Sequence, residues 1–492
     1  MYFSKSRYTK ATKCPKALWL ELNKPELCEI SADAQERMDI GTAVGKLAQK
    51  RFDGCVVVPF DGNNLGNMVR RTEELLQQGT EYIAEASFAV DKLFCSVDIL
   101  HYLGGRVVEL YEVKSTSKAK EYFYDDVAFQ CYVLTRCGYE VRRAFLMYLN
   151  NQYVRHGDLD LSALFTVEDV TERAKAAHDA VAANVERFAA YMEQTEEPTD
   201  DLDTRCIQDD DFCELWDYCS RHLPKPNVFD LGKKTSFKYY KNGLVSLSDL
   251  HDAGQVPEKK QLQVDHALFD LPPHIEKAAI RSFLSELTYP LYFLDFETCQ
   301  MAVPQYDDAQ TYAQIPFQYS LHYIEAEGGE VQHKEYLAYP ADGDPRRGVA
   351  ERLCADIPEN VCTLAYHKDF EQGRVKEMAR LFPDLAEHLM NIHAHIIDLE
   401  TPFKDHAYYV RAMEGRSSIK WVLPALCPND PELDYHNLEG VHGGTEASRA
   451  FRAMADMTPE TLEEWRGHLL EYCKLDTLAM VKVLEKLREA AK

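Results

Sequence analysis

The sequence predicts an α/β (α+β) protein with two mixed sheets, each covered by helices. Strand patterns occur in two separate places, first at residues 85–114 and later in the segment LYFLDFE. Helical patterns follow, at residues 121–138 and again at the end of the chain. Residues 221–285, which are rich in Pro, Gly and Lys, separate the two halves. A chain of 492 residues is long enough for such a division.

The first half of the chain is expected to begin with helices, because apolar residues recur at roughly helical spacing in residues 1–60. SFAVDKLFCSVDIL and RVVELYEVK read as two strands that a hairpin joins at Gly104-Gly105. The remaining elements of this half are expected to be a helix at 121–138, a strand at 141–149 and a long amphipathic helix at 167–194.

The second half is expected to open a new domain at Tyr289-Pro290, where the apolar strand LYFLDFE begins. The chain should end in a strong helix, for which Thr458 is a plausible N-cap and Pro459 the first helical residue. Composition and pattern therefore divide the chain into three parts: residues 1–222, a helical connector at 223–285, and residues 286–492.

Composition excludes several classes of protein. No apolar run approaches the ~20 residues that cross a bilayer, and the N-terminus lacks the apolar stretch of a signal peptide. We therefore expect a cytoplasmic protein without a membrane partner. Cytosolic thiols stay reduced, so the 14 cysteines do not indicate disulfides. The net charge of -26 argues against a protein that coats nucleic acid non-specifically, because phosphate contacts dominate such binding.

A first group of candidate site residues is Asp98, Glu112 and Lys114. Glu112 and Lys114 are two residues apart, so they share one face of a strand, and Asp98 lies on the neighbouring candidate strand. Two carboxylates can hold Mg²⁺ through hard oxygen ligands, and a lysine can orient or help to deprotonate a water. This chemistry suits phosphodiester hydrolysis. The alternative is a solvated edge of a sheet.

A second group consists of cysteines. Cys206, Cys213 and Cys219 lie close together in sequence, and Cys14 lies far upstream. An iron–sulfur cluster needs four thiolates, and zinc accepts the same donors in a tetrahedron. The spacings are wider than the CxxC pairs of zinc ribbons, which favours the cluster. Unrelated buried cysteines are the alternative.

A third group joins the first strand and the last helix of the second half. Asp295 and Glu297 share one face of an apolar strand, where two carboxylates are costly unless a metal or another group compensates them. Tyr472 and Asp476 are four residues apart and therefore share one face of the last helix. A core strand that ends at a solvated edge is the alternative.

The first group resembles the RecB-type branch of the PD-(D/E)XK nucleases, whose sheet is restriction-endonuclease-like. The resemblance implies that Asp98 and Glu112 bind metal and that Lys114 is catalytic. It adds Gln130, on the helix after the sheet, as a second catalytic residue. The family usually has a tyrosine three or four residues beyond this glutamine, whereas Tyr132 is two beyond. Tyr132 is therefore a doubtful site residue.

One cysteine before that nuclease core and three after it resemble the iron–sulfur members of the RecB type. In them the cluster joins the two ends of the nuclease domain. The resemblance implies that Cys14, Cys206, Cys213 and Cys219 are ligands of a structural 4Fe-4S cluster. Zinc at the same four thiolates is the alternative cofactor.

The third group resembles the tyrosine subtype of the DEDD-type 3′–5′ exonucleases, which have an RNase H-like fold. The resemblance implies that Asp295, Glu297 and Asp476 bind two divalent ions, Mg²⁺ or Mn²⁺, and that Tyr472 positions the attacking water. Two-metal sites hold their ions ~3.5–4 Å apart.

The family's remaining acid follows a strand between these motifs, and LAYHKDFEQGRVKEM has a strand-then-helix pattern. Phe370-Glu371 occupies the place of an aromatic–Asp pair, so Glu371 is the predicted ligand and Asp369 the alternative. Asp398 could be a helix cap. Lys420 could approach a phosphate, and a solvated lysine is equally compatible with the sequence.

As a whole, the chain resembles a family of bacterial proteins of unassigned function. They join an iron–sulfur RecB-like nuclease region to an RNase H-like exonuclease region. The resemblance predicts a metal-dependent nuclease, with a 3′–5′ exonuclease in residues 286–492 and a second nuclease site in residues 1–222. DNA, single-stranded, is the expected partner, and no protein partner is indicated. The alternative is a binding protein in which residues 1–222 are an inactive, cluster-stapled scaffold.

The connector contains lysines interleaved with aromatic residues. Such a pattern can follow a single strand by charge and stacking. The alternative is a small helical connector whose aromatic residues form its core. The residues concerned are Lys233, Lys234, Lys238 and Lys241, with Phe237, Tyr239 and Tyr240.

Overall fold

The computed structural model describes residues 3–199, 201–428 and 430–492. The chain forms two compact units. Unit 1 contains residues 1–223, 233–237 and 301–313, and unit 2 contains residues 224–232, 238–300 and 314–492. Each unit has its own sheet, and the protein is α/β with mixed sheets, as the sequence predicts. In the described part of the chain, no helix is long and apolar enough to cross a membrane.

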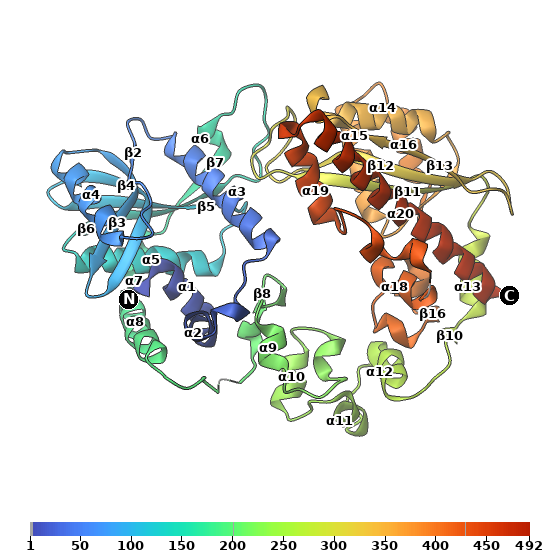
Figure 1. The fold of residues 1–492 in the computed structure, drawn as a ribbon, viewed down its shortest axis with the longest axis horizontal. Helices are drawn as coiled ribbons and strands as arrows, with labels where there is room; N and C mark the ends of the chain where they lie inside the picture. The colour runs from blue at the N-terminus through green and yellow to red at the C-terminus, as the bar shows by residue number, and fades with distance from the viewer. Residues whose placement is uncertain (1–2, 200, 429) are drawn as a thin grey trace. The chain divides into compact units, whose positions relative to one another are not determined.

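A seven-stranded mixed sheet is the centre of unit 1 (Figure 1). In spatial order, its main path consists of β2 (Val56–Val57), β3 (Tyr82–Val90), β4 (Leu93–Gly104), β5 (Val107–Lys114), β6 (Glu140–Leu149) and β7 (Phe165–Asp169). The short strand β1 (Phe3–Ser4) pairs in parallel with β4. β3, β4 and β5 are antiparallel neighbours, whereas β6 runs parallel to β5, because α5 (Glu121–Arg136) carries the chain across.

Helices cover both faces of this sheet. α1 (Lys5–Lys13), α4 (Leu65–Gln77), α5 and α8 (His178–Met192) contribute to one apolar cluster with the sheet. α3 (Ala32–Gln49) packs in a second cluster with Ile99 and Met147. Val108 and Leu110 of β5 belong to the first cluster, so Glu112, two residues further on, faces α1 and α5.

Two sequence predictions for unit 1 were wrong. The stretch SFAVDKLFCSVDIL is not one strand, because a turn at Asp91 and Lys92 divides it into the end of β3 and the start of β4. Both turn residues have positive φ, 46° and 69°, as a type I′ hairpin requires, and no glycine marks the turn. The predicted helix at 167–194 is also interrupted. Its first residues extend β7, because they pair with β6, and α7 (Thr171–Ala176) precedes α8.

The other predicted elements of unit 1 are confirmed, with α5 and β6 within two residues of the expected bounds. Short elements complete the unit. They are α2 (Pro15–Asn23), η1 (Pro25–Leu27), α6 (Leu161–Leu164), η2 (Thr204–Cys206), β8 (Ile207–Gln208), β9 (Asp211–Phe212) and α9 (Trp216–Ser220).

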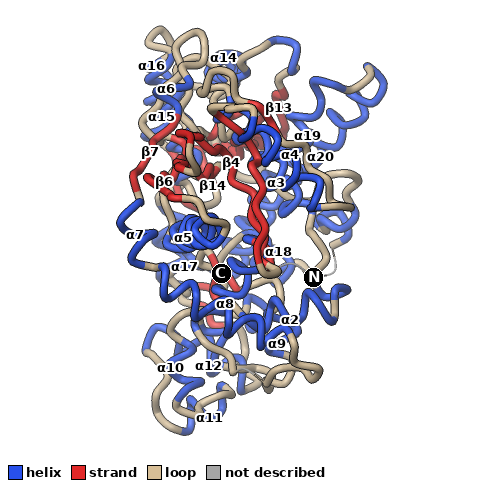
Figure 2. Tube along the Cα trace, turned by 90° about the vertical axis from the view of Figure 1, so that its left-hand side faces the viewer, coloured by secondary structure: helices blue, strands red, loops and turns tan. Residues whose placement is uncertain are grey.

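The connector consists of short helices joined by loops, as Figure 2 shows for α10 to α12. This agrees with the helical connector that the sequence predicts, although the division into domains stays a prediction. Its elements are η3 (Val228–Leu231), α10 (Ser236–Lys241), α11 (Leu247–Asp252), η4 (Glu258–Lys260), α12 (Gln261–Leu268), β10 (His274–Ile275) and α13 (Lys277–Ser285).

Unit 2 contains a five-stranded mixed sheet in the order β13-β12-β11-β14-β15. The three strands β11, β14 and β15 are parallel, and β12 is antiparallel to both of its neighbours. This order is compatible with the predicted RNase H-like sheet. The strands are β11 (Leu291–Gln300), β12 (Gln314–Ile324), β13 (Gln332–Leu337), β14 (Cys362–Ala365) and β15 (Ile396–Asp398).

The two faces of this sheet carry different helices. α14 (Pro345–Asp356), α15 (Asp369–Leu381) and α16 (Ala386–Ala394) contribute to an apolar cluster with Leu294 and Phe296. α13, α18 (Ile419–Leu426) and α20 (Pro459–Ala491) pack with Leu291 and Phe293 on the other side. Asp295 and Glu297 continue the series of Leu291 and Phe293, so the strand aims them at α20.

The start of the last helix agrees with the sequence prediction. The side chain of Thr458 accepts a hydrogen bond from the backbone N–H of Thr461, and Pro459 is the first helical residue. Smaller elements of unit 2 are η5 (Pro340–Asp342), α17 (Thr401–Lys404), β16 (Tyr408–Tyr409), η6 (Arg411–Met413), η7 (Pro431–Leu433), η8 (Tyr435–Asn437), α19 (Gly444–Ala453) and η9 (Met454–Asp456).

The segment 301–313 follows β11 in sequence but packs with unit 1. The backbone N–H of Arg155 donates to the carbonyl of Ala309 at 3.0 Å, and that of Asp308 donates to the carbonyl of Arg155 at 2.8 Å. Ala302 and Tyr312 contribute apolar surface to the cluster around α3. The loop that directly follows β11, a strand of unit 2, therefore contributes to the core of unit 1.

Candidate metal centres

The carboxylates of unit 2 meet where β11 passes beneath α20. Asp295 and Glu297 lie on β11, and the pairing of β11 with β12 shifts register directly after Glu297. Asp476 lies on α20, one turn after Tyr472, and both side chains are buried. The face of α20 that carries Tyr472 and Asp476 therefore packs against the face of β11 that carries Asp295 and Glu297, and each pair shares a face as predicted. We call Asp295, Glu297, Glu371 and Asp476 the C-terminal centre.

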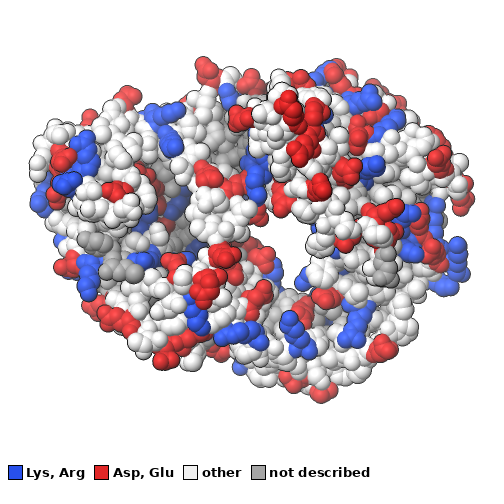
Figure 3. All heavy atoms as spheres, in the orientation of Figure 1, with Lys and Arg blue, Asp and Glu red and all other residues white. Residues whose placement is uncertain are grey.

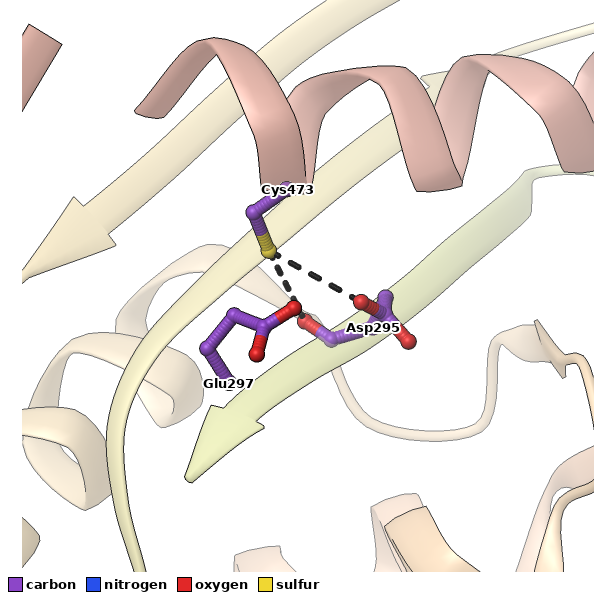
Figure 4. Close-up of side chains that lie close together, drawn as sticks. All are labelled: Asp295, Glu297 and Cys473. Carbon is purple, nitrogen blue, oxygen red and sulfur yellow. Dashed lines mark hydrogen bonds between the residues drawn. The ribbon is translucent and has the colours of Figure 1, made fainter. Parts of the chain in front are cut away.

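Figure 4 shows the closest part of this centre, with Cys473 of α20 above Asp295 and Glu297 of β11. One ligand atom from each of these three residues lies within 4.8 Å of the other two. The Cys473 thiol donates to the Asp295 carboxylate at 3.8 Å and to the Asp295 carbonyl at 3.9 Å. Cys473 was not among the predicted site residues, although its place between Tyr472 and Asp476 was a signal for it.

Glu371 reaches the same centre from the first turn of α15, which follows β14. Its side chain is buried, and its Oε2 atom has no hydrogen-bond partner. The negative charge of Glu371 raises the pKa of both Asp295 and Glu297, so it lies near them. Asp369, the alternative ligand, is exposed. The geometry thus brings Glu371, rather than Asp369, to the other carboxylates.

Burial raises the pKa values of all four carboxyl groups, and repulsion within the centre raises those of Asp295 and Glu297 further. Burial raises the pKa of Glu297 to about 8, and the charge of Asp476 adds to this effect. Burial raises the pKa of Glu371 to about 8 and that of Asp476 to about 6. The pKa of Asp295 lies well above its usual range, because burial and then the neighbouring Asp476 disfavour its charge. Lys420 lowers the pKa values of Glu297 and Asp476 only in part, so burial of the acids is incompletely compensated.

The donor set of the C-terminal centre fits divalent cations. Among the described residues, no Lys, Arg or His nitrogen lies within 4.0 Å of any of the four carboxylates. One buried carboxylate oxygen, Oε2 of Glu371, is left without any partner. Uncompensated buried charge is costly, and hard oxygen ligands suit Mg²⁺ and Mn²⁺. Lys420 lies nearby but forms no ion pair with the acids, so a divalent cation would complete the charge balance of this arrangement.

Two further residues touch this centre. The hydroxyl of Tyr435 donates to the Asp476 carboxylate at 2.5 Å, and Lys420 Nζ lies 3.4 Å from the Tyr472 hydroxyl. Burial, followed by the charges of Asp476 and Glu297, raises the pKa of Tyr472, so its hydroxyl stays protonated. Tyr435 was missed by the sequence reading, since it lies in a short η8 turn without a recognisable motif.

A pocket of about 570 Å³ adjoins the C-terminal centre. Lys420 and Tyr435 line the pocket and also contact Tyr472 and Asp476. Its other polar lining residues include His436, Asn437 and His442.

Asp398, considered as a helix cap, has another role. Its Oδ1 atom accepts the backbone N–H groups of His367, at 3.0 Å, and of Glu400, at 3.0 Å. His367 has a left-handed φ of 67°, and its ring bonds to Glu400 at 2.9 Å. Asp398 therefore fixes the backbone turn that leads from β14 into α15 and its Glu371.

The candidate residues of unit 1 also meet in one place. Asp98 is on β4, Glu112 and Lys114 are on β5, and Gln130 is on α5. Lys114 Nζ donates to Glu112 Oε1 at 2.7 Å, and Gln130 Nε2 donates to Glu112 Oε2 at 2.6 Å. The backbone N–H of Val113 donates to Asp98 Oδ2 at 2.7 Å. We call Asp98, Glu112, Lys114 and Gln130 the N-terminal centre.

Three residues that the sequence reading missed belong to the surroundings of the N-terminal centre. Lys5, at the start of α1, donates to Glu112 Oε2 at 3.0 Å and to Asp98 Oδ1 at 3.5 Å. Asp126 of α5 accepts a hydrogen bond from Lys114. Its position four residues before Gln130 was the signal for it. Glu85 sits opposite Asp98 at an irregularity of the β3–β4 ladder and has a left-handed φ of 57°.

The charges of this centre compensate one another. Burial alone would raise the pKa of Glu112, but the ammonium groups of Lys114 and Lys5 outweigh it and hold the pKa at about 2. Burial would lower the pKa of Lys5, yet Asp98 and Glu112 raise it well above its usual range. Burial and then Glu112 raise the pKa of Asp98 to about 6. Burial and then Asp98 raise that of Glu85 to about 7.

Tyr132 lies away from the N-terminal centre. Its hydroxyl accepts a hydrogen bond from Arg136 at 2.9 Å, and its ring packs against His178 at 5.2 Å. Two residues along a helix turn the side chain to nearly the opposite side from Gln130. The doubt about Tyr132 is therefore supported by the structure.

The four candidate thiols lie near one another within unit 1. Cys14 is the residue between α1 and α2, and the others lie on or beside η2, β9 and α9. Burial raises the pKa of Cys213 to about 12, and the neighbouring thiols Cys206, Cys14 and Cys219 add to this effect. Within the described residues, no three of their sulfur atoms lie within 4.8 Å of one another.

The basic residues of the connector are partly used in ion pairs. Lys233 pairs with Asp211, and Lys234 pairs with Asp210, each at 2.5 Å. Phe237 is buried, which supports the interpretation of a connector with aromatic core residues. Figure 3 shows Asp and Glu interspersed with Lys and Arg on the face drawn.

A family model and a solved structure each match part of the chain. A family model described as a domain of unknown function, DUF2779, matches residues 292–418. No curated protein matches the chain. Among solved structures, the chain is similar to an alkaline exonuclease (LHK-Exo) from Laribacter hongkongensis, with 12% identity, 39% of this chain and 90% of that chain covered, and a TM-score of 0.18. The matched DUF2779 segment contains Asp295, Glu297 and Glu371 and ends before α20.

Proposed function

We propose that this protein is a metal-dependent nuclease whose unit 2 hydrolyses phosphodiester bonds of nucleic acid. One observation carries the proposal. Four acidic side chains from β11, α15 and α20 converge in a buried place, and among the described residues none of them forms an ion pair with a Lys, Arg or His. Divalent cations are the usual compensation for such a cluster, and phosphodiester hydrolysis is a reaction that they assist.

Asp295, Glu297, Glu371 and Asp476 would hold two Mg²⁺ or Mn²⁺ ions, which stabilise negative charge on the phosphate and activate water when bound. Tyr472 remains protonated at neutral pH, so its hydroxyl can orient the attacking water but cannot act as a base. Lys420, 3.4 Å from that hydroxyl, can contribute positive charge toward a phosphate oxygen. These residues supply binding and orientation.

The adjoining pocket supports a nucleotide as the bound group. Its volume of about 570 Å³ falls within the usual range for small-molecule sites. Lys420 brings an ammonium group to it, His436 and His442 bring ring nitrogen atoms, and Asn437 brings an amide, beside the carboxylates of Asp430 and Asp434. We propose single-stranded DNA, degraded from its 3′ end, as the substrate. The polarity rests on the resemblance to DEDD-type exonucleases.

We further propose a 4Fe-4S cluster at Cys14, Cys206, Cys213 and Cys219. Thiols from both ends of unit 1 come together, as a structural cluster requires. A zinc tetrahedron, with Zn–S distances of about 2.3 Å, would place the sulfur atoms about 3.8 Å apart. Zinc at the same four thiolates is the alternative. Anaerobically purified protein should absorb near 400 nm and lose this band in Cys213→Ala, whereas colourless protein with stoichiometric zinc would contradict the cluster.

Degradation of end-labelled single-stranded DNA with Mg²⁺ or Mn²⁺ tests the nuclease proposal. Asp295→Asn and Asp476→Asn should each lower the rate at least about 100-fold, because each removes a ligand from the centre. Glu471→Gln is the matched control, since Glu471 is exposed on the same helix α20 and should leave the rate unchanged. Wild-type protein that binds the DNA without degrading it would instead support the alternative of a binding protein.

The sequence also predicts a second nuclease site at Asp98, Glu112, Lys114 and Gln130. The proposal for hydrolysis does not include this site, because the ammonium of Lys5 lies between the two carboxylates that would hold its metal. DNA degradation is therefore assigned to unit 2.

A further inference from the structure

The two carboxylates of the N-terminal centre have no free oxygen atom. Glu112 Oε1 accepts from Lys114 at 2.7 Å and from Lys5 at 3.1 Å, and Glu112 Oε2 accepts from Gln130 at 2.6 Å and from Lys5 at 3.0 Å. Asp98 Oδ2 accepts the N–H of Val113, and Asp98 Oδ1 faces Lys5. Every oxygen that would bind a metal is thus already bonded to an N–H donor.

The Lys5 ammonium lies between the two carboxylates, where a bound metal ion would lie. Its Nζ atom is 3.0–3.5 Å from oxygen atoms of both Glu112 and Asp98. A Mg²⁺ ion shared by the same two carboxylates would lie about 2.0–2.1 Å from its oxygen ligands. An ammonium and an ion cannot both fit between them. The residues therefore do not fit the divalent cation that the nuclease resemblance implies for this site.

The fold holds Lys5 in this place from both sides. Phe3 and Ser4 pair with β4 as strand β1, and Ser4 then caps α1, which begins at Lys5. One turn further along α1, Tyr8 is buried and stacks on Phe129 of α5, with ring centroids 4.6 Å apart. A strand pair before Lys5 and an aromatic contact after it fix the backbone, from which the Lys5 side chain reaches the carboxylates.

We propose that Lys5 takes the place of a divalent cation in the N-terminal centre, so that this centre binds no metal and unit 1 acts as a scaffold rather than as a second hydrolase. Asp98, Glu112 and Asp126 bring three negative charges, and Lys5 and Lys114 bring two positive ones. The two ammonium groups therefore already pair with the Asp98 and Glu112 carboxylates that a metal would bind. The proposal concerns unit 1 and does not depend on hydrolysis by unit 2.

Mn²⁺ binding, followed through the electron paramagnetic resonance signal of free Mn²⁺, tests this proposal without measuring activity. An Asp295→Asn/Asp476→Asn background removes binding by unit 2. In it, we expect no bound Mn²⁺ with Lys5 present and one Mn²⁺ per chain after Lys5→Met. Adding Glu112→Gln should remove that ion again. Lys10→Met, on the same helix but paired with Glu21, is the matched control and should bind none.

Two results would overturn the proposal. One is a Mn²⁺ ion in the background protein that Glu112→Gln removes, because the centre would then bind metal despite Lys5. The other is a folded Lys5→Met protein that gains no ion. If Mn²⁺ bound by the background protein persists after Glu112→Gln, unit 2 or another place holds it, and the proposal for unit 2 has to be revised instead.

A second measurement avoids a variant of Lys5. Amine acetylation followed by mass spectrometry reports how accessible Lys5 is in the background protein, with the exposed Lys118 as internal reference. We expect weak labelling of Lys5 relative to Lys118 and the same ratio with 5 mM Mn²⁺. An increase of several-fold in Lys5 labelling on adding Mn²⁺ would show that an ion displaces the ammonium and would overturn the proposal.

Discussion

The two carboxylate centres of this protein use similar residue types but differ in how their charge is balanced. In the N-terminal centre, Lys5 and Lys114 donate to Glu112, and the pKa of Glu112 falls to about 2. In the C-terminal centre, burial and the neighbouring acids raise the pKa of Glu297 to about 8. A glutamate at the end of a buried strand is thus stabilised as an anion in one unit and destabilised in the other.

The difference shows that a pair of acids on a strand does not by itself indicate a metal site. Whether such a pair can bind a metal depends on the residues that the rest of the fold places beside the acids. A lysine from α1 forms ion pairs within the N-terminal centre, whereas no described Lys, Arg or His pairs with an acid of the C-terminal one. Buried acids that form no ion pair destabilise the metal-free protein when they are ionised, and their oxygen atoms can bind a metal ion.

The largest expected effect is on stability. Replacing a glutamate by glutamine should change the free energy of unfolding in opposite directions in the two centres. Glu112→Gln should lower the free energy of unfolding by roughly 3 kcal/mol, because it removes the buried carboxylate that the two partly buried ammonium groups share. Glu297→Gln should raise it by on the order of 1–3 kcal/mol at pH 9, because a disfavoured charge disappears. Urea unfolding in EDTA measures both values.

Equal changes for the two variants, or destabilisation by Glu297→Gln in EDTA, would contradict the comparison. The sign follows from the pKa shifts. The lowered pKa of Glu112 contributes stability above its unfolded value near 4.5, and this contribution is lost as the pH falls toward 2. The raised pKa of Glu297 makes the metal-free protein less stable as the pH rises from about 4.5 to 8.

The second effect concerns the fourth ligand of the C-terminal centre. Glu371→Gln should reduce DNA degradation by about 10- to 100-fold, because it replaces the carboxylate that has an unpartnered oxygen. Asp369→Asn is the matched control on the same turn of α15, and it should leave the rate within twofold, since Asp369 is exposed. The reverse result would restore Asp369 as the ligand.

The smallest expected effect is the pH dependence of metal affinity. Asp476 and Glu297, with pKa values of about 6 and about 8 in the metal-free protein, must release protons when an ion binds. The affinity for Mn²⁺ should therefore rise between pH 6 and 8, about tenfold per unit for each proton released. Calorimetry in buffers of different ionisation enthalpy counts these protons. An affinity that is independent of pH would show that the acids are already ionised.

The sequence predicted much of the architecture, and its errors have local causes. The last helix was placed correctly, because Thr458 and Pro459 are strong start signals. The turn at Asp91 and Lys92 was missed, because these residues adopt left-handed backbone without a glycine to mark it. The residues of the C-terminal centre, which lie on three elements, were predicted from the sequence. Strand and helix periodicity fix which residues of one element share a face.

The residues that the sequence reading missed are contacts between distant segments. Lys5 meets Glu112 across 107 residues, and Tyr435 meets Asp476 across 41. Neither lies at a spacing that local periodicity would link to its partner. Cys473 and Asp126 differ, because each is next to or one turn from a predicted residue, and helical spacing could have found them.

By itself, the sequence determined which residues line each strand and helix face, because those periods are properties of the local backbone. The tertiary structure alone decided which charges face those acids, because ion pairing depends on segments that only folding brings together. The acids of unit 2 form no ion pair among the described residues, and those of unit 1 pair with Lys5. That difference in electrostatics distinguishes a candidate metal site from a balanced, buried charge cluster.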